Sequence, residues 1–397
     1  MNNNTFQPGA GRALFFSTTA FAVSFAVWGL IAALAPTFTQ IYNLSATEKS
    51  LLIAIPVLLG SIGRIFAGMA ADRFGGRVVF SALLIFSAIP AVAIAFSTSF
   101  AQLLVFGLLL GVAGTTFPVG VGFASKWFSK EKQGTALGIY GAGNVGQSIA
   151  VFFAPVLALQ FGDWRTVFFV FAAITFIWGI IFYFLARDAA VTAQPKTLAE
   201  NLSVLKRSKT AWILSLFYFL TFGGFVALAL YLPTFLKEIF NLSATDAGAR
   251  TAGFVLLATL LRPVGGILAD KIGGGRVLMV VFAAIAALSL LLSFTTIVLF
   301  TIGALGCAAA LGLGNGAVFK LVPQYFPNET ATVTGLVGAF GGLGGFFPPL
   351  ELGFVKEATG SYTIGFVLLS LFALVCLAVN YFSFLRGEKT AEADLAF

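Results

Sequence analysis

Two arginines stand alone in the middle of long apolar stretches, where they could hold an anion. Arg64 and Arg262 lie 198 residues apart. A guanidinium stays charged at any working pH, and its planar fork of N–H donors matches the oxygen edge of a small oxyanion. No Asp or Glu falls at the same depth of a predicted helix, so a bound anion is the natural partner of the pair. In the alternative, backbone carbonyls or water satisfy the two arginines, which then serve only packing.

The residues around the two arginines repeat at the same offset. A chain of 397 residues that repeats at about half its length is a duplicated structure. The first copy contains Leu58-Leu59, Gly68, Ala71-Asp72 and Gly75-Gly76, which recur as Leu256-Leu257, Gly266, Ala269-Asp270 and Gly273-Gly274, and Asn43–Thr47 recurs as Asn241–Thr245.

The composition identifies the class of protein. Hydrophobic residues make up 59% and charged residues 10% of the chain, against about 45–50% and about 25% in soluble domains. Apolar runs of about 20 residues are long enough to cross a bilayer. We therefore predict an all-α integral membrane protein with twelve spanning helices, at 14–38, 51–71, 77–96, 100–124, 133–159, 164–185, 211–235, 248–270, 276–296, 298–321, 331–355 and 361–385.

The longest polar stretch divides these helices into two sets of six. We predict an N-terminal six-helix bundle over 1–186, a cytoplasmic linker over 187–210 and a C-terminal six-helix bundle over 211–397. Each repeat starts on the same side of the membrane, which predicts parallel repeats related by an axis along the membrane normal.

The net charge of +8 could indicate a nucleic-acid partner, but its distribution favours a topology signal. With the amino terminus in the cytoplasm, the predicted cytoplasmic segments carry fifteen Lys and Arg and the opposite segments five. This bias predicts a multi-pass protein of the cell inner membrane, in contact with lipid, with both termini cytoplasmic. The first span is too long for a cleaved signal peptide. Cys307 and Cys376 lie in apolar spans and predict neither a disulfide framework nor a metal site.

Two short loops carry the same charged motif, after the second and the eighth span. The twelve spans, the central linker and these doubled loops resemble the major facilitator superfamily over nearly the whole chain. In that family the loop residues latch the cytoplasmic helix ends in one state of a rocking cycle. The resemblance assigns this role to Asp72, Arg73, Arg77, Asp270, Lys271 and Arg276.

Glycines at three- and four-residue spacing mark the fifth and the eleventh span. Such spacing lets helix backbones approach closely, and it predicts a narrow space beside the arginines in which only a small ligand fits. Asn144 offers an amide within this wall. The glycines are Gly138, Gly141, Gly143 and Gly146 on the fifth span, and Gly338, Gly341, Gly342, Gly344 and Gly345 on the eleventh.

These two glycine segments resemble the paired signatures of the nitrate/nitrite porter family. The resemblance implies that Arg64 and Arg262 hold the anion and that Asn144 hydrogen-bonds it. It also implies that aromatic residues of the fourth and seventh spans, Phe117, Tyr218 and Phe222, close the pocket. Asn315 is the repeat partner of Phe117, so we expect it to face the same pocket.

The residues favour nitrate and nitrite independently of the resemblance, because these planar monoanions match a guanidinium fork. A carrier of another small monoanion such as formate stays an alternative, and a receptor that only senses the anion is a weaker one. The chain has no histidine. Proton symport and nitrate/nitrite exchange both stay open, with Lys320 and Glu351 as possible gate or coupling residues.

No nucleophile, metal cluster or nucleotide motif indicates an enzyme or an ATP-driven pump. We expect no cofactor and a monomer.

Overall fold

The computed structural model describes residues 9–128, 130–189, 208–326 and 330–386, and of 72, 130–135, 323 and 330–332 it describes the backbone alone. Every regular element in these ranges is a helix. Twelve helical stretches among the described residues are long and apolar enough to cross a membrane, as predicted.

The first six stretches come from residues up to 185. The first is interrupted at Gly29, the fourth contains a 3₁₀ segment, η1 (Gly111–Thr115), and the fifth contains another, η2 (Ala142–Asn144). The α-helices are α1 (Ala10–Trp28), α2 (Leu30–Tyr42), α3 (Ala46–Phe74), α4 (Gly76–Ala95), α5 (Phe100–Leu110), α6 (Thr116–Ser125), α7 (Lys130–Gly141), α8 (Val145–Phe161) and α9 (Trp164–Leu185).

The last six stretches begin at Lys209. The seventh contains a π-helical segment, η3 (Phe219–Gly223), and the twelfth ends in another, η4 (Tyr381–Leu385). The α-helices are α11 (Lys209–Tyr218), α12 (Gly224–Phe240), α13 (Ala244–Ile272), α14 (Gly274–Leu291), α15 (Ile297–Tyr325), α16 (Thr330–Thr359) and α17 (Thr363–Asn380).

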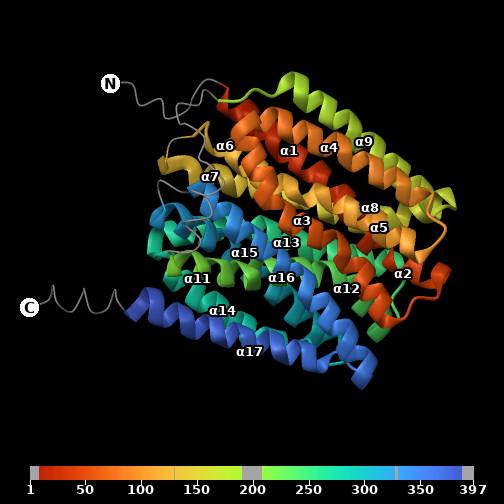
Figure 1. The fold of residues 1–397 in the computed structure, drawn as a ribbon. Helices are drawn as coiled ribbons and strands as arrows, with labels where there is room; N and C mark the ends of the chain where they lie inside the picture. The colour runs from red at the N-terminus through yellow and green to blue at the C-terminus, as the bar shows by residue number, and fades with distance from the viewer. Residues whose placement is uncertain (1–8, 129, 190–207, 327–329, 387–397) are drawn as a thin grey trace, which may run out of the picture.

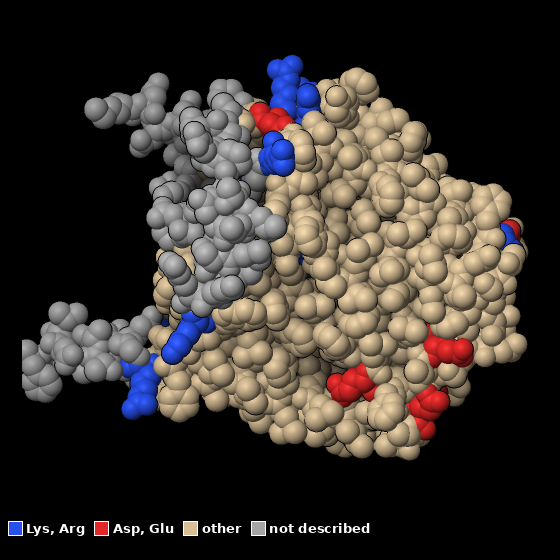
Figure 2. Space-filling model, viewed as in Figure 1, with Lys and Arg blue, Asp and Glu red and all other residues tan. Residues whose placement is uncertain are grey.

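The helices before and after residue 200 lie in two groups, with α1–α9 above and α11–α17 below in Figure 1. We call residues 1–186 the N-half and residues 211–397 the C-half. The first described residues, at the start of α1, and the last, at the end of η4, lie at the left, which we call the terminus end; the opposite end is the far end. Lys and Arg gather at the terminus end and most visible Asp and Glu at the far end, with an uncharged band between them (Figure 2). Large apolar side chains such as Phe66 and Phe184 are exposed, as a lipid-facing surface requires.

The sequence repeats are signals that end one helix and start the next. Asn43 and Asn241 cap α2 and α12 in the left-handed region, with φ of 52° and 55°. Ser45 and Ser243 then accept the backbone N–H of Glu48 and Asp246 at the start of α3 and α13. These caps satisfy backbone groups that a helix end leaves unpaired. Equal caps give the two halves equal helix boundaries.

Candidate functional site

Arg64 and Arg262 are both buried, with 1% and 4% of their surface exposed. Arg64 of α3 donates from Nε to the Gly114 carbonyl at 3.2 Å and from Nη1 to the Gly338 carbonyl, in the other half, at 2.6 Å. Arg262 of α13 donates from Nη2 to the Tyr218 hydroxyl at 3.2 Å, and its Nη1 has no partner among the described residues. Backbone therefore satisfies part of Arg64, as the alternative foresaw, while Arg262 keeps a buried donor.

Two stacked rings lie beside both guanidinium groups. Phe117 of α6 and Phe222 of η3 have centroids 6.1 Å apart and planes 19° apart. The Arg64 Cζ atom lies 5.5 and 5.1 Å from the two centroids, and the Arg262 Cζ atom lies 5.9 and 5.7 Å from them. Tyr218 stacks on Phe222 at 5.0 Å. The fold thus brings the two arginines, one from each half, to a single pair of rings.

Two buried amides have polar atoms without a hydrogen-bond partner in the described ranges. Asn144 is 0% exposed, and neither its Nδ2 nor its Oδ1 has a hydrogen-bond partner in the described part of the chain. Asn315, on α15, is equally buried, and its Oδ1 is unpartnered in the same sense. A buried polar atom without a partner costs about 1–3 kcal/mol. These amides therefore have hydrogen-bonding groups free for a polar ligand or for water.

Three aromatic residues that the sequence did not single out, Tyr140, Phe21 and Phe319, pack around Phe117. Tyr140 of α7 is fully buried, donates to the Phe117 carbonyl at 3.1 Å and stacks on Phe21 at 4.9 Å. Phe319 lies 5.7 Å from Phe117 and 4.9 Å from Tyr218 between ring centroids. The sequence held a signal for Tyr140 and Phe319. Tyr140 lies within the glycine segment of the fifth span, and Phe319 follows Asn315 by one helical turn.

The predicted glycines lie at close approaches. A Cβ on Gly141 would stand 3.4 Å from the Arg262 Nε, and one on Gly341 would stand 2.2 Å from the Tyr218 ring. Gly338 supplies the carbonyl that binds Arg64. The remaining glycines pack against helices: Gly138 on Pro263, Gly143 on Phe21, Gly146 on Ala22, Gly342 on Ser61, Gly344 on Phe219 and Gly223, and Gly345 on Val226.

A family model described as Major Facilitator Superfamily matches residues 16–349 and, in a second match, residues 214–396. The chain belongs to the major facilitator superfamily. The nitrite extrusion protein of Bacillus subtilis (strain 168) is 43% identical to the transporter over 362 residues, 91% of each chain. The probable nitrate transporter NarT of Staphylococcus epidermidis is 39% identical, covering 92% of the transporter and 94% of that relative.

These relatives assign the transporter to the nitrate/nitrite porters of the superfamily, so it is a multi-pass membrane transporter and not an enzyme. A crystal structure of the human organic anion transporter MFSD10 (TETRAN) superimposes with a TM-score of 0.76. The superposition covers 94% of the transporter and 100% of the human chain. At 16% sequence identity, this similarity shows the fold alone.

Two of the residues predicted to latch the terminus end contact residues of their own helix group or of the chain directly after it. Asp270 forms an ion pair with Lys320 of α15. The Arg77 backbone N–H donates to Asp188 Oδ1 at 3.0 Å, and its guanidinium lies over the Tyr183 ring at 5.2 Å. Arg73, Lys271 and Arg276 lie at the same end of α3, α13 and α14, whereas the Asp72 side chain lies outside the described residues. Asp188 was not predicted as a partner of this loop.

Glu351 lines a cavity of about 550 Å³ between α12, α16 and α17. Its Oε1 is buried and has no partner among the described residues. The rest of the lining is apolar or glycine and includes Phe219, the first residue of η3. Glu351 thus faces a lateral cavity behind the spanning helix that carries Tyr218 and Phe222.

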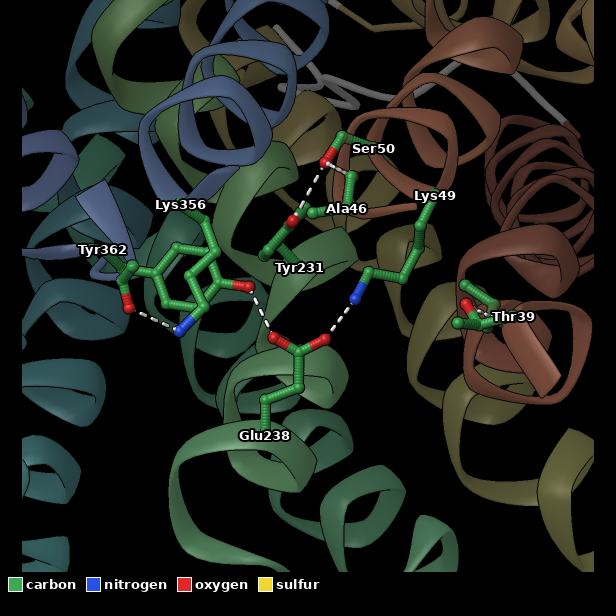
Figure 3. Close-up of polar contacts among 10 residues, drawn as sticks. Thr39, Ala46, Lys49, Ser50, Tyr231, Glu238, Lys356 and Tyr362 are labelled. Atoms are coloured by element: carbon green, nitrogen blue, oxygen red, sulfur yellow. Dashed lines mark hydrogen bonds and ion pairs between the residues drawn. The ribbon is translucent and has the colours of Figure 1, made fainter. Parts of the chain in front are cut away.

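A polar network joins the two halves at the far end (Figure 3). Lys49 of α3, 5% exposed, forms an ion pair with Glu238 of α12, and the other Glu238 oxygen accepts the Tyr362 hydroxyl at 2.6 Å. Beside this ion pair, the hydroxyls of Ser50, the residue after Lys49, and Tyr231 of α12 lie 2.9 Å apart. Burial, with Tyr231 and Glu238 nearby, raises the pKa of the Tyr362 phenol. We call these five residues the polar seam; sequence reasoning missed all of them.

The second contact between the halves at the far end joins α8 to α13. Ser148 Oγ donates to the Ala252 carbonyl at 3.1 Å. A Cβ on Gly248 would stand 2.6 Å from the Val151 carbonyl oxygen, so the two backbones touch. We call Ser148, Val151, Gly248 and Ala252 the glycine seam.

Proposed function

We propose that this protein is a secondary transporter that carries nitrate and nitrite across the membrane by alternating access, with the anion held between Arg64 and Arg262. The observation that carries this proposal is the approach of both guanidinium groups to the same two rings. The unpaired Arg262 Nη1 and the Asn144 amide add donors at this site. Tyr218, Phe117, Phe222 and Asn315 complete the proposed pocket.

The ligand follows from charge and shape. Among the described residues, no carboxylate is within ion-pair distance of either arginine. Two buried cations with one polyatomic monoanion leave a net positive charge, whereas without the anion they repel each other. A planar nitrate or nitrite presents oxygen edges to the guanidinium fork and a face to the stacked rings. The glycine segments beside the arginines leave room only for a small guest.

The moving parts in this proposal are the N-half and the C-half. The polar seam and the glycine seam close the far end, so the anion would enter or leave at the terminus end in this state. Basic side chains gather at the terminus end in Figure 2, which supports a cytoplasmic location of both termini in the plasma membrane. Asp72, Arg73, Arg77, Asp270, Lys271 and Arg276 would then latch the cytoplasmic side in the opposite state.

Coupling is proposed in two forms that the same assay separates. Exchange of nitrate for nitrite needs no titratable group, and the chain contains no histidine. Proton symport would use Glu351, whose shielded oxygen lies behind the hinge-like η3 segment, or Lys320, which would have to leave Asp270. The related proteins are named for extrusion of nitrite and for transport of nitrate, which fits either form.

The test is counterflow of labelled nitrate in proteoliposomes loaded with nitrate or nitrite. Arg64→Lys and Arg262→Lys keep the charge but lose the bidentate fork, so we expect at least about a 10-fold fall in exchange, equivalent to about 1.4 kcal/mol. Arg165→Lys, at a half-exposed arginine of the far end, is the matched control and should behave as wild type.

Three results would decide against parts of the proposal. If both lysine variants exchanged nitrate at the wild-type rate, the proposal that the two arginines hold the anion would be wrong. Stronger competition by formate than by unlabelled nitrate would favour the alternative substrate. Nitrate uptake that follows an imposed pH gradient without internal anion would select symport over exchange.

A further inference from the structure

Gln147 is a buried amide without a hydrogen-bond partner among the described residues. It lies in the first turn of α8 and is 0% exposed. Neither its Nε2 nor its Oε1 has a hydrogen-bond partner within the part of the chain that the structure describes. A primary amide offers two donors and an acceptor, and burying them unpaired costs free energy that a packing residue would not incur. Leucine would fill the same space without that cost.

Gln147 continues a row of site residues along one helix. Gly141 lies under the Arg262 guanidinium, Asn144 ends η2, and Gln147 follows three residues later. Residues three apart share a helix face, and three residues advance the row by about 4.5 Å toward the far end. Gln147 and Asn144 therefore present two unpaired amides, one turn apart.

The surroundings of Gln147 place it at the far-end boundary of the proposed pocket. The next residue, Ser148, donates across the interface to the Ala252 carbonyl and belongs to the glycine seam. A Cβ on Gly29 would stand 3.4 Å from the Gln147 Cγ, and Gly29 is where the first spanning helix changes from α1 to α2. Gln147 thus lies along its helix between Gly141, which contacts Arg262, and the glycine seam. It also lies beside the interruption at Gly29 in the first spanning helix.

We propose that Gln147 is a second amide ligand of the transported anion, which it contacts on the path between the arginines and the far end. Its NH₂ group donates to an oxygen of a small planar monoanion as the far end opens. This assignment rests on the proposed function, because it takes the same anion and the same direction of movement. The assignment predicts that Gln147 affects binding of the anion from the far face but not from the terminus face.

The test compares Gln147→Leu with wild type in vesicles of one orientation, with initial rates of labelled nitrate uptake measured from each face. We expect the KM at the far face to rise at least about 10-fold, as for the loss of a hydrogen bond to a charged group. The KM at the terminus face should change less than about 2-fold. Gln147→Asn, which keeps a shorter amide, should recover part of the far-face KM. Gln160→Leu, at an exposed glutamine of the same helix, is the control.

Two outcomes would overturn the assignment. One is an unchanged far-face KM in Gln147→Leu, with Asn144→Leu impaired. The other is a lowered melting temperature of the solubilised protein with both KM values intact, which would make Gln147 a structural residue. In both cases wild-type transport of nitrate would leave the proposed function standing. If the wild type moved neither nitrate nor nitrite from either face, the proposed function itself would fail, and this inference with it.

Discussion

Helices α3 and α13 occupy equivalent places in the two repeats, yet their first turns meet the opposite half through different chemistry. Lys49 and Ser50 of α3 enter the polar seam. At the same offset of 198 residues, α13 has Ala247 and Gly248, and Gly248 presses on the α8 backbone. Duplication thus kept the helix caps and the arginines but changed how each side of the far end closes.

The difference indicates how the far end can open. The glycine seam depends on shape, because it consists of a close backbone approach and one hydrogen bond from a serine hydroxyl, and none of these groups carries a net charge. The polar seam depends on an ion pair and two hydroxyl contacts, and the Glu238 side chain is one third exposed. Water and salt therefore reach the polar seam more easily. We expect the polar seam to separate and the glycine seam to act as the pivot.

The largest effect is expected from adding bulk to the pivot. In Gly248→Val the new Cβ would meet the Val151 carbonyl oxygen, which is backbone and cannot move aside. Overpacking of this kind costs about 1–3 kcal/mol, so anion counterflow should fall up to about 100-fold. Gly253→Val is the control, since a Cβ on Gly253 meets nothing within 4 Å on the same helix. Full activity in Gly248→Val would show that the two backbones do not need to touch.

The next effect is expected from removing the charge of Glu238. In Glu238→Gln the buried Lys49 loses its counter-charge, which favours states in which Lys49 reaches water. Because the pair is partly exposed, we expect about 1–1.4 kcal/mol, or a 5- to 10-fold change. The measurement is labelling of Val57→Cys, buried on α3 below the seam, by a membrane-impermeant thiol reagent from the far face.

A charge-reversed pair separates this effect from general damage. In the Val57→Cys background, Lys49→Glu alone should raise the rate of thiol labelling from the far face. Lys49→Glu combined with Glu238→Lys should return this rate toward that of Val57→Cys alone. Additive behaviour of the two changes would mean that the ion pair does not hold the seam.

A smaller effect is expected at Tyr362. Tyr362→Phe removes the 2.6 Å hydrogen bond to Glu238, and labelling of Val57→Cys should rise about 3- to 5-fold. The raised pKa of Tyr362 means that the closed seam favours the neutral phenol, so its contribution is complete below the ordinary tyrosine pKa of about 10 and is lost only well above it.

The ratio of labelling rates between Tyr362→Phe and wild type should therefore stay constant from about pH 7.5 to about pH 9.5. Lys49, Lys356 and Tyr231 are the other titratable groups that face Tyr362 or its carboxylate partner. A ratio that falls over this range would show that Tyr362 ionises at its ordinary pKa.

The smallest effect is expected from Ser148→Ala in the glycine seam. The hydroxyl donates to the Ala252 carbonyl at 3.1 Å, but the close backbone contacts of Gly248 remain after its removal. We expect about 0.5 kcal/mol, or about a 2-fold change in counterflow. A larger fall in counterflow for Ser148→Ala than for Glu238→Gln would reverse the assignment of pivot and opening side.

The sequence was sufficient for the features that depend on local order along the chain. Apolar length predicted the twelve spans, and the Asn and Ser of the repeat fixed the helix boundaries through their caps. The offset between Arg64 and Arg262 predicted equal depth, which needs only the rise per residue of a helix. The glycine spacing predicted close helix contacts, although not which helix each glycine would face.

Contacts between the halves depend on how two surfaces pack, and periodicity does not encode that. No local pattern pairs Lys49 with Glu238, 189 residues away, or supplies Arg64 with the carbonyl of Gly338. The 3₁₀ and π segments that contain Asn144 and Phe222 or precede Phe117 were likewise not predicted from the sequence. The sequence by itself determined the helices, the matching positions of Arg64 and Arg262 in the two repeats, and the class of transporter. The tertiary structure decided which donors remain unpaired and which seam is polar, because hydrogen bonding and burial follow from neighbours distant in the chain.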